Sequence, residues 1–108
     1  MVKHIVFFKV KKTHNDNEKI NLAKQIAEIL KPLPKKIPQI KEYEIGINIS
    51  DRDTAFDVVL ISIFENEEGL NIYRFHPEHQ KAVEKIKELT QEAAVVDYNQ
   101  IEFFYSKK

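Results

Sequence analysis

Two segments of the chain, residues 2–10 and 55–64, carry apolar side chains at both odd and even positions. Successive side chains of a strand point to opposite faces, so each segment predicts a strand with two apolar faces. Such strands lie in the centre of a sheet, and both faces of that sheet must be covered. The rest of the chain therefore has to supply cover for at least one face.

Two further strands are predicted. Residues 40–49 are apolar on one face only, which is typical of an edge strand. That face carries Tyr43, Ile45, Ile47 and Ile49. The polar turn of residues 50–53 connects this strand to residues 55–64 at hairpin length. The last strand is expected over about residues 95–105.

The helices are marked by capping residues and prolines. Asn15 and Asp16 begin a helix whose apolar residues recur at helical spacing through Leu30. Three prolines then end it and start a turn-rich connection: Pro32, Pro34 and Pro38. A short helix over residues 67–75 follows its cap at Asn66.

Another helix is expected to begin at Pro77, because a proline suits the first helical position. The same proline pushes His76 out of the helical region, so the preceding helix ends there. The apolar stripe of the helix that begins at Pro77 comprises Ala82, Val83, Ile86 and Leu89.

The order strand, helix, strand, strand, helix, strand predicts a single α+β domain over residues 1–108. It is the ferredoxin-like βαββαβ arrangement, an antiparallel sheet with strand order 4-1-3-2. The helices would cover one face and leave Phe, Ile and Val side chains on the other. A second copy, packed sheet against sheet about a twofold axis, is the simplest cover. We therefore expect a homodimer packed sheet against sheet.

Composition excludes several functions. The 17 basic and 17 acidic residues give no net charge, which argues against nucleic acid as a partner. The chain has no cysteine for disulfides or thiol chemistry. It has no apolar run near the ~20 residues of a membrane helix. We expect a cytoplasmic protein without a membrane partner. The sequence also lacks fingerprints for a flavin or nicotinamide, so we expect no cofactor.

Candidate chemistry is concentrated between Tyr73 and His79. His79 would lie in the first turn of the last helix, where burial and the positive helix end favour a neutral imidazole able to accept a proton. The alternative is a core histidine bonded to the backbone. Tyr73 could orient a carbonyl or enol oxygen. Its alternative is a packed aromatic with its hydroxyl at the surface.

Two other histidines are candidate ligand-binding residues. His4 shares a strand face with apolar residues and would line a pocket if that face meets the helices, or the dimer interface if it does not. His76 is expected mainly as a helix cap beside Pro77. His76 and His79 have a spacing that metals use, but without a third convergent ligand we predict no metal site.

An ordered set of short segments resembles one known family. The segments are Met1-Val2-Lys3-His4-Ile5-Val6-Phe7-Phe8-Lys9-Val10, Gly46-Ile47-Asn48-Ile49-Ser50, Phe56-Asp57-Val58-Val59-Leu60, Tyr73 with His76-Pro77-Glu78-His79, and Val96-Asp97-Tyr98. Together they are similar to the stress-responsive A/B barrel domain proteins, or dimeric α+β barrels. This resemblance implies a dimer whose two sheets form a barrel, and implies no single activity.

One plant member of that family is a polyketide cyclase. By similarity, its working tyrosine and histidine fall on Tyr73 and His79, and a pocket histidine falls on His4. The chain departs from it at Val58, where the cyclase has a histidine. Three functions follow as hypotheses: a domain of unassigned role that binds a small apolar or aromatic ligand, a cofactor-free enzyme with a His/Tyr acid–base pair, or a purely structural assembly protein.

Overall fold

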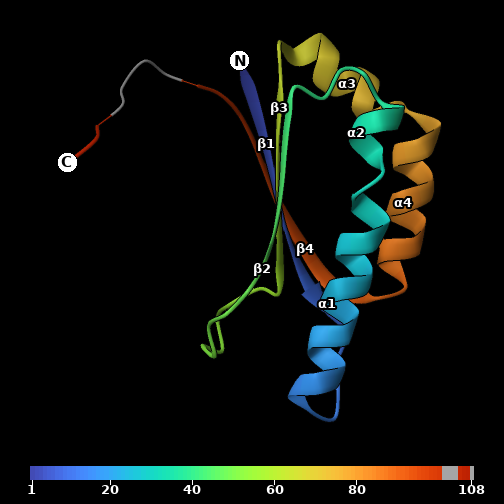
Figure 1. Ribbon diagram of the computed structural model, residues 1–108, viewed down its shortest axis with the longest axis vertical. Coiled ribbons are helices and arrows are strands. Elements are labelled where there is room, and N and C mark those ends of the chain that lie inside the picture. Colours follow the sequence, from blue (N-terminus) through green and yellow to red (C-terminus); the bar gives the residue numbers. More distant parts are fainter. Residues whose placement is uncertain (101–104, 108) are drawn as a thin grey trace.

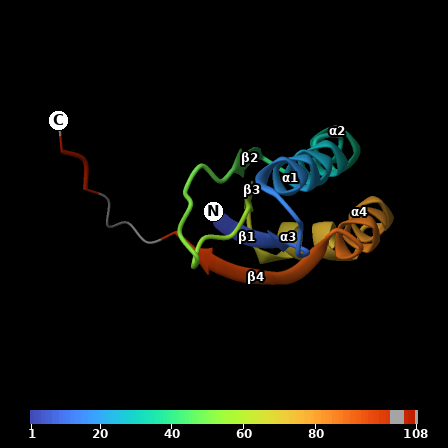
Figure 2. The same cartoon turned by 90° about the horizontal axis from the view of Figure 1, so that it is seen from below.

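A computed structural model describes residues 1–100 and 105–107 of the chain (Figure 1). The elements are β1 (Val2–Val10), α1 (Asp16–Leu30), α2 (Leu33–Lys36), β2 (Glu42–Ile47), β3 (Val58–Phe64), α3 (Glu67–Phe75), α4 (Pro77–Lys87) and β4 (Thr90–Asn99). The helices lie together on one side of the sheet (Figures 1 and 2). The predicted α+β, ferredoxin-like class is confirmed.

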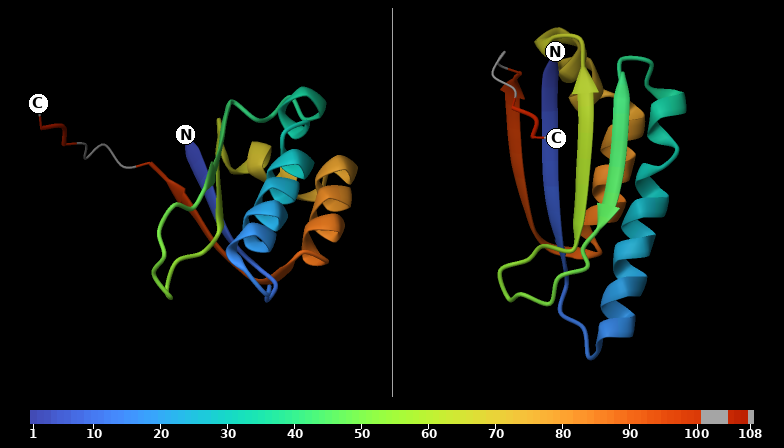
Figure 3. Two further views of the ribbon diagram at one scale, coloured as in Figure 1. Left: turned by 60° about the horizontal axis from the view of Figure 1, so that its bottom comes forward. Right: turned by 60° about the vertical axis from the view of Figure 1, so that its left-hand side comes forward.

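The four strands form one antiparallel sheet in the order β2-β3-β1-β4, with the central strands side by side in Figure 3. The predicted order 4-1-3-2 is therefore right. β1 and β3 are central, as their two apolar faces indicated, and β2 and β4 are the edges. The apolar residues on only one face of β2 correctly predicted that it is an edge strand.

The core lies between the sheet and the helices. Alternate residues of β3 face the helices and are buried, including Leu60 at 1% exposed and Phe64 at 0%. They meet Ile26 and Leu30 of α1, which repeat at the spacing of one helix face. Tyr73 of α3 belongs to the same core.

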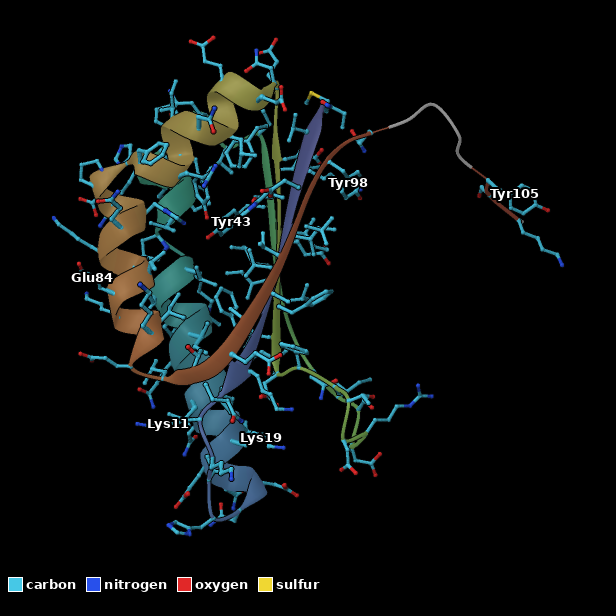
Figure 4. The ribbon with its side chains drawn as sticks, turned by 180° about the vertical axis from the view of Figure 1, so that it is seen from behind. Lys11, Lys19, Tyr43, Glu84, Tyr98 and Tyr105 are labelled. Atoms are coloured by element: carbon cyan, nitrogen blue, oxygen red, sulfur yellow. The ribbon has the colours of Figure 1, made fainter. Side chains whose placement is uncertain are left out.

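The opposite face of the sheet, here the outer sheet face, carries the second apolar set that the sequence predicted. Phe7 is 41% exposed and Val96 is 54% exposed. The strand registers place the other members on the same face: Ile5, Val59, Ile61, Ile63 and Tyr98. Tyr98 projects away from the helices in Figure 4. No helix of the described chain covers this face.

The last strand begins earlier than predicted. We expected residues 95–105, whereas β4 begins at Thr90 and ends at Asn99. Its first half has no apolar alternation, because an edge strand is held by its backbone ladder with β1 and needs no buried side. Residues 101–104 lie outside the described residues, and residues 105–107 are not in a strand.

Two other predictions needed correction. β2 is shorter than residues 40–49, and Ile49 lies in the following connection, 102% exposed, instead of on the apolar face of the strand. The proline-rich connection contains a short helix, α2, with Pro34 in its first turn, a position that proline tolerates because that N–H has no helical partner.

Helix boundaries follow the capping signals. The Asn15 side chain accepts from the N–H of Glu18 at 2.9 Å, and Asn66 accepts from that of Gly69 at 2.9 Å. These bonds satisfy N–H groups that the first turn leaves free.

Gly46 of β2 is a point of close approach to β3, since a Cβ there would lie 2.9 Å from Val59 Cγ1. In the part of the chain described here, no helix has the length and apolar character to cross a membrane.

Candidate functional site

His4 faces the helices. It is 7% exposed and lies on the same side of β1 as Val2 and Val10, both of which belong to the core. Side chains two apart on a strand share a face, so His4 lies on the helix-facing side, as a pocket-lining role requires. The dimer-interface alternative for His4 is wrong.

Tyr73 and His79 meet His4 across the chain. Tyr73 of α3 is fully buried, and its ring centroid lies 4.3 Å from that of His79 in the first turn of α4. The His4 ring is 5.7 Å from the Tyr73 ring, edge to face. The break at Pro77 allows this contact, because it lets α4 begin directly after α3 with His79 turned back towards Tyr73. The structure therefore brings three of the four predicted site residues together.

Asp97 is a fourth member that sequence reasoning missed. The β1–β4 register places it directly opposite His4, and its carboxylate oxygen Oδ1 is hydrogen-bonded to His4 Nδ1. The only sequence signal was its place in the Val96-Asp97-Tyr98 segment. A partner 93 residues away can be found only once the strand register is known. His4, Tyr73, His79 and Asp97 are called the histidine–tyrosine cluster below.

The hydrogen bonds of the two histidines fix their tautomers. His79 Nδ1 lies 3.0 Å from the carbonyl oxygen of Arg74, which can only accept, so Nδ1 carries the proton. His4 Nδ1 faces the Asp97 carboxylate, an acceptor when ionised, and therefore also donates. Whenever such a ring is neutral, its Nε2 is the acceptor, and neither Nε2 has a hydrogen-bond partner among the residues that the structure describes.

The hydroxyl of Tyr73 is buried and has no hydrogen-bond partner among the described residues. Burial raises the pKa of this phenol far above its ordinary value of 10.0, so the group keeps its proton and remains a donor. Leaving a buried polar group unsatisfied costs about 1–3 kcal/mol. The expectation of a surface hydroxyl is therefore wrong, because this hydroxyl is buried and unpaired among the residues that the structure describes.

Tyr43 offers a useful contrast. Its hydroxyl donates to the carbonyl oxygen of Leu30 at 3.1 Å, and its side chain extends from β2 into the layer between sheet and helices (Figure 4). Burial, and to a smaller extent the neighbouring Tyr73, raises the pKa of Tyr43. The Tyr43 hydroxyl thus has a hydrogen-bond partner within the fold, whereas the neighbouring Tyr73 hydroxyl has none among the described residues.

His79 is held in its neutral form. Burial is the main cause that lowers its pKa below the ordinary 6.5, and the nearby His4, Arg74 and His76 act in the same direction. The backbone hydrogen bond to Arg74 opposes them but does not reverse the shift. The backbone bond of the core-histidine alternative is present at His79, whereas its role as a proton acceptor stays a prediction.

Apolar groups border the cluster on the β4 side. Val95 pairs with Val6 and so faces the helices, yet it is 57% exposed. Val6 and Phe8 beside it are only partly buried. The helix layer therefore leaves the inner side of β4 open next to Asp97. Two surface hollows of about 740 and 250 Å³ lie elsewhere on the protein.

His76 is used as a helix cap. Its Nδ1 accepts from the backbone N–H of Glu78 at 3.1 Å, which satisfies the start of α4. The Glu78 carboxylate pairs with Lys36 at 3.4 Å and Lys81 at 3.7 Å. Within residues 1–100 and 105–107, no three histidine, aspartate or glutamate side chains are grouped as metal ligands.

Val58 faces the same layer and is 2% exposed. Where the cyclase resemblance implies a histidine, this chain has an apolar side chain.

Comparisons with known proteins agree with this fold. The sequence model of the stress responsive A/B barrel domain matches residues 2–100. An uncharacterized protein of Streptomyces coelicolor is 32% identical over 83 residues, which are 77% of this chain and 84% of that protein.

Two solved structures are also similar. One is a dimeric Bacteroides fragilis protein of unknown function with a ferredoxin-like fold, which has a TM-score of 0.79 and 33% identity, covering 92% of this chain and 95% of that one. The other, a hydroxynitrile lyase from Passiflora edulis, has a TM-score of 0.78 and 21% identity, with 96% of each chain covered. At that identity the second likeness shows the fold alone.

Proposed function

The chain belongs to the stress-responsive A/B barrel domain family, and we propose that it binds a small, largely apolar or aromatic molecule with a carbonyl or hydroxyl oxygen at the histidine–tyrosine cluster. The ligand oxygen would accept from the Tyr73 hydroxyl, and a ligand hydroxyl would donate to a histidine Nε2. The exposed Val95 and the half-buried Phe8 would contact its apolar part.

The buried, unpartnered hydroxyl of Tyr73 carries this proposal. A packing role alone does not explain it, since phenylalanine would fill the same core position without the cost of an unsatisfied donor. Its neighbours are two imidazoles with free acceptor nitrogens. A hydroxyl or enol ligand can satisfy both kinds of group at once, which a purely apolar ligand cannot.

A second candidate function is cofactor-free proton transfer on the same ligand, and the His4–Asp97 pair favours it. A carboxylate bonded to Nδ1 orients the ring and stabilises the imidazolium that forms when Nε2 takes a proton. Tyr73 would then stabilise the resulting oxyanion or enolate as a neutral donor. The fold neighbour named as a hydroxynitrile lyase indicates that a chain of this architecture can act as an enzyme.

Self-association through the outer sheet face is part of the proposal. The Bacteroides fragilis relative is described as dimeric, and Phe7 and Val96 form an uncovered apolar surface here. The cytoplasmic location stays a prediction; the cysteine-free composition is compatible with it.

Tyr73→Phe, compared with Tyr43→Phe, tests the proposed function. Acetophenone and phenol serve as probes, with binding followed by amide NMR shifts and with thermal unfolding measured in parallel. Tyr73→Phe should weaken binding about 10-fold, the equivalent of one hydrogen bond of ~1.4 kcal/mol, and leave stability unchanged or raised. Tyr43→Phe should lower the unfolding free energy by about 1 kcal/mol and leave binding unchanged.

Equal binding by wild type and Tyr73→Phe, or no probe shifts at His4, Tyr73 or His79 at millimolar concentration, would contradict the proposal. Proton transfer, the second candidate function, would be supported if His4→Gln and Asp97→Asn lost turnover of a ligand that they still bind. Turnover unchanged in both variants would exclude it.

A further inference from the structure

The larger of the two surface hollows lies at the other end of the sheet from the histidine–tyrosine cluster. It has a volume of about 740 Å³, within the usual range of small-molecule sites. Its walls are the end of β1, the first turns of α1, residues 47–57 between β2 and β3, and Gln91. We call it the lysine cleft. No residue of the histidine–tyrosine cluster lines it.

The loop that forms one wall is braced. The Asn48 side chain donates to the Ser50 carbonyl at 2.7 Å and accepts from the Ser50 N–H at 3.0 Å. At the base of the loop, the Asp57 N–H donates to the Phe8 carbonyl at 2.8 Å, and the Asp57 carboxylate accepts from the Val10 N–H at 2.8 Å. The cleft is therefore preformed and does not have to be ordered by a ligand.

Apolar side chains from three elements line the cleft although they are exposed to solvent. Ile49 of the loop is 102% exposed, Ile20 of α1 is 44% exposed and Ile47 at the end of β2 is 39% exposed. Three exposed isoleucines around one hollow form an apolar contact surface that the fold itself does not use.

The cleft is also rich in cations that have no ion-pair partner. Its basic lining residues are Lys9, Lys11, Lys12, Lys19 and Arg52. The ion pairs found among residues 1–100 and 105–107 include none of them. Lys11 and Lys19 both line the cleft and lie in the region where β1 leads into α1 (Figure 4). The Lys9 Nζ lies 5.7 Å from the centroid of the Phe56 ring. The cations that remain available to an anion from outside the chain are therefore Lys11, Lys12, Lys19 and Arg52.

The carboxylates of the cleft are Asp16, Asp51, Asp53 and Asp57. Asp57 is 7% exposed, and its carboxylate already accepts a hydrogen bond from the Val10 N–H, so it is engaged within the fold. Asp16 is in the first turn of α1, where the helix dipole attracts its charge.

We propose that the lysine cleft binds an amphipathic organic anion, with an alkyl chain or aromatic body against the isoleucines and a carboxylate or phosphate head at the lysines. The apolar surface alone would accept a neutral molecule. The lining holds five basic residues and four carboxylates, and of the carboxylates Asp57 accepts a backbone N–H and Asp16 lies at a helix start, so the charge left over favours an anion. This site is independent of the proposed function, because it shares no residue with the histidine–tyrosine cluster.

Titration of the full-length protein with decanoate, decyl phosphate and decanol tests the proposal, with amide and methyl NMR shifts as the readout. Decanoate or decyl phosphate should shift the resonances of Ile20 and Ile49 and bind at least 10-fold more tightly than decanol. The tighter of the two anions identifies the head group. Lys19→Glu should weaken anion binding at least 5-fold, and Lys85→Glu on α4 should leave it unchanged.

Arg52→Glu is a second variant with the same expected loss, in case Lys19→Glu folds poorly. Equal binding of decanol, shifts confined to His4, Tyr73 and His79, or no shifts at millimolar probe would overturn the proposal. It would also be overturned if Ile49 were protected from solvent in the ligand-free protein, because a second copy would then occupy the cleft.

Discussion

At the scale of single residues, the important feature is how the fold sets hydrogen-bond roles. Tyr43 is half-buried and Tyr73 fully buried, and among the described residues the Tyr43 hydroxyl has a hydrogen-bond partner whereas the Tyr73 hydroxyl has none. His4 and His79 both use Nδ1 within the fold, and neither Nε2 has a partner in the described part of the chain. These assignments follow from the acceptors that the backbone and Asp97 place beside each ring. They make the cluster suited to a ligand that both donates and accepts.

The lowered pKa of His79 predicts a pH dependence of stability. The unfolded chain binds a proton at this site near pH 6.5, whereas the folded chain does so only at lower pH. The unfolded state therefore binds more protons in that window, and stability falls as the pH drops through 6.5 towards the folded pKa. Urea unfolding at pH 7.5 and 5.0 should show a smaller loss in His79→Gln than in wild type. NMR titration of His79 with a midpoint above 6.5 would refute this.

At the scale of secondary-structure elements, the break between α3 and α4 positions the site. His76 ends one helix and caps the next, and Pro77 starts α4 so that His79 lies against Tyr73. A continuous helix would carry residue 79 around its axis, away from this contact. The predicted role of His76 as a cap is confirmed, whereas its role as a ligand-binding residue stays a prediction.

Substitution of His76 separates the two roles. His76→Ala should lower the unfolding free energy by about 1 kcal/mol, the usual cost of losing a helix cap. His76→Asn should restore most of it, because asparagine also accepts from the first turn. Thermal unfolding measures both, and probe binding at the histidine–tyrosine cluster should be unchanged in His76→Asn. A loss of binding without loss of stability would instead make His76 a ligand contact.

At the scale of the whole molecule, one layer of helices covers one face of the sheet and leaves the other apolar. The sequence left open which alternate set of β1 faces a partner. The structure places Ile5 and Phe7 on the outer sheet face, and Val6 and Phe8 towards the helices. Phe7 lies between Val59 and Ala94 in the ladders, near the middle of the face.

Phe7→Glu should therefore dissociate the proposed homodimer, because it would place a charge in an interface that buries apolar surface. Ile72→Glu is the matched control, since Ile72 on α3 is 42% exposed and Phe7 is 41% exposed. Sedimentation velocity at micromolar concentration should show a dimer for wild type and the control, and a monomer for Phe7→Glu. A monomeric wild type, or a Phe7→Glu dimer, would contradict this.

The sequence by itself determined the order of the elements, the central and edge strands and the helix starts. These depend on local periodicity and on capping residues such as Asn15, Asn66 and Pro77, which act within a few neighbours. It missed the start of β4, because an edge strand held by backbone bonds needs no apolar pattern.

Only the tertiary structure decided the chemistry of the site. The His4–Asp97 bond depends on a strand register across 93 residues, and the isolation of the Tyr73 hydroxyl depends on which partners reach it. It also decided that Ile49 leaves its strand to line the lysine cleft. Periodicity tells which side of an element is apolar. The contacts of one polar atom depend on how distant elements are placed, and the packing of the whole chain sets that placement.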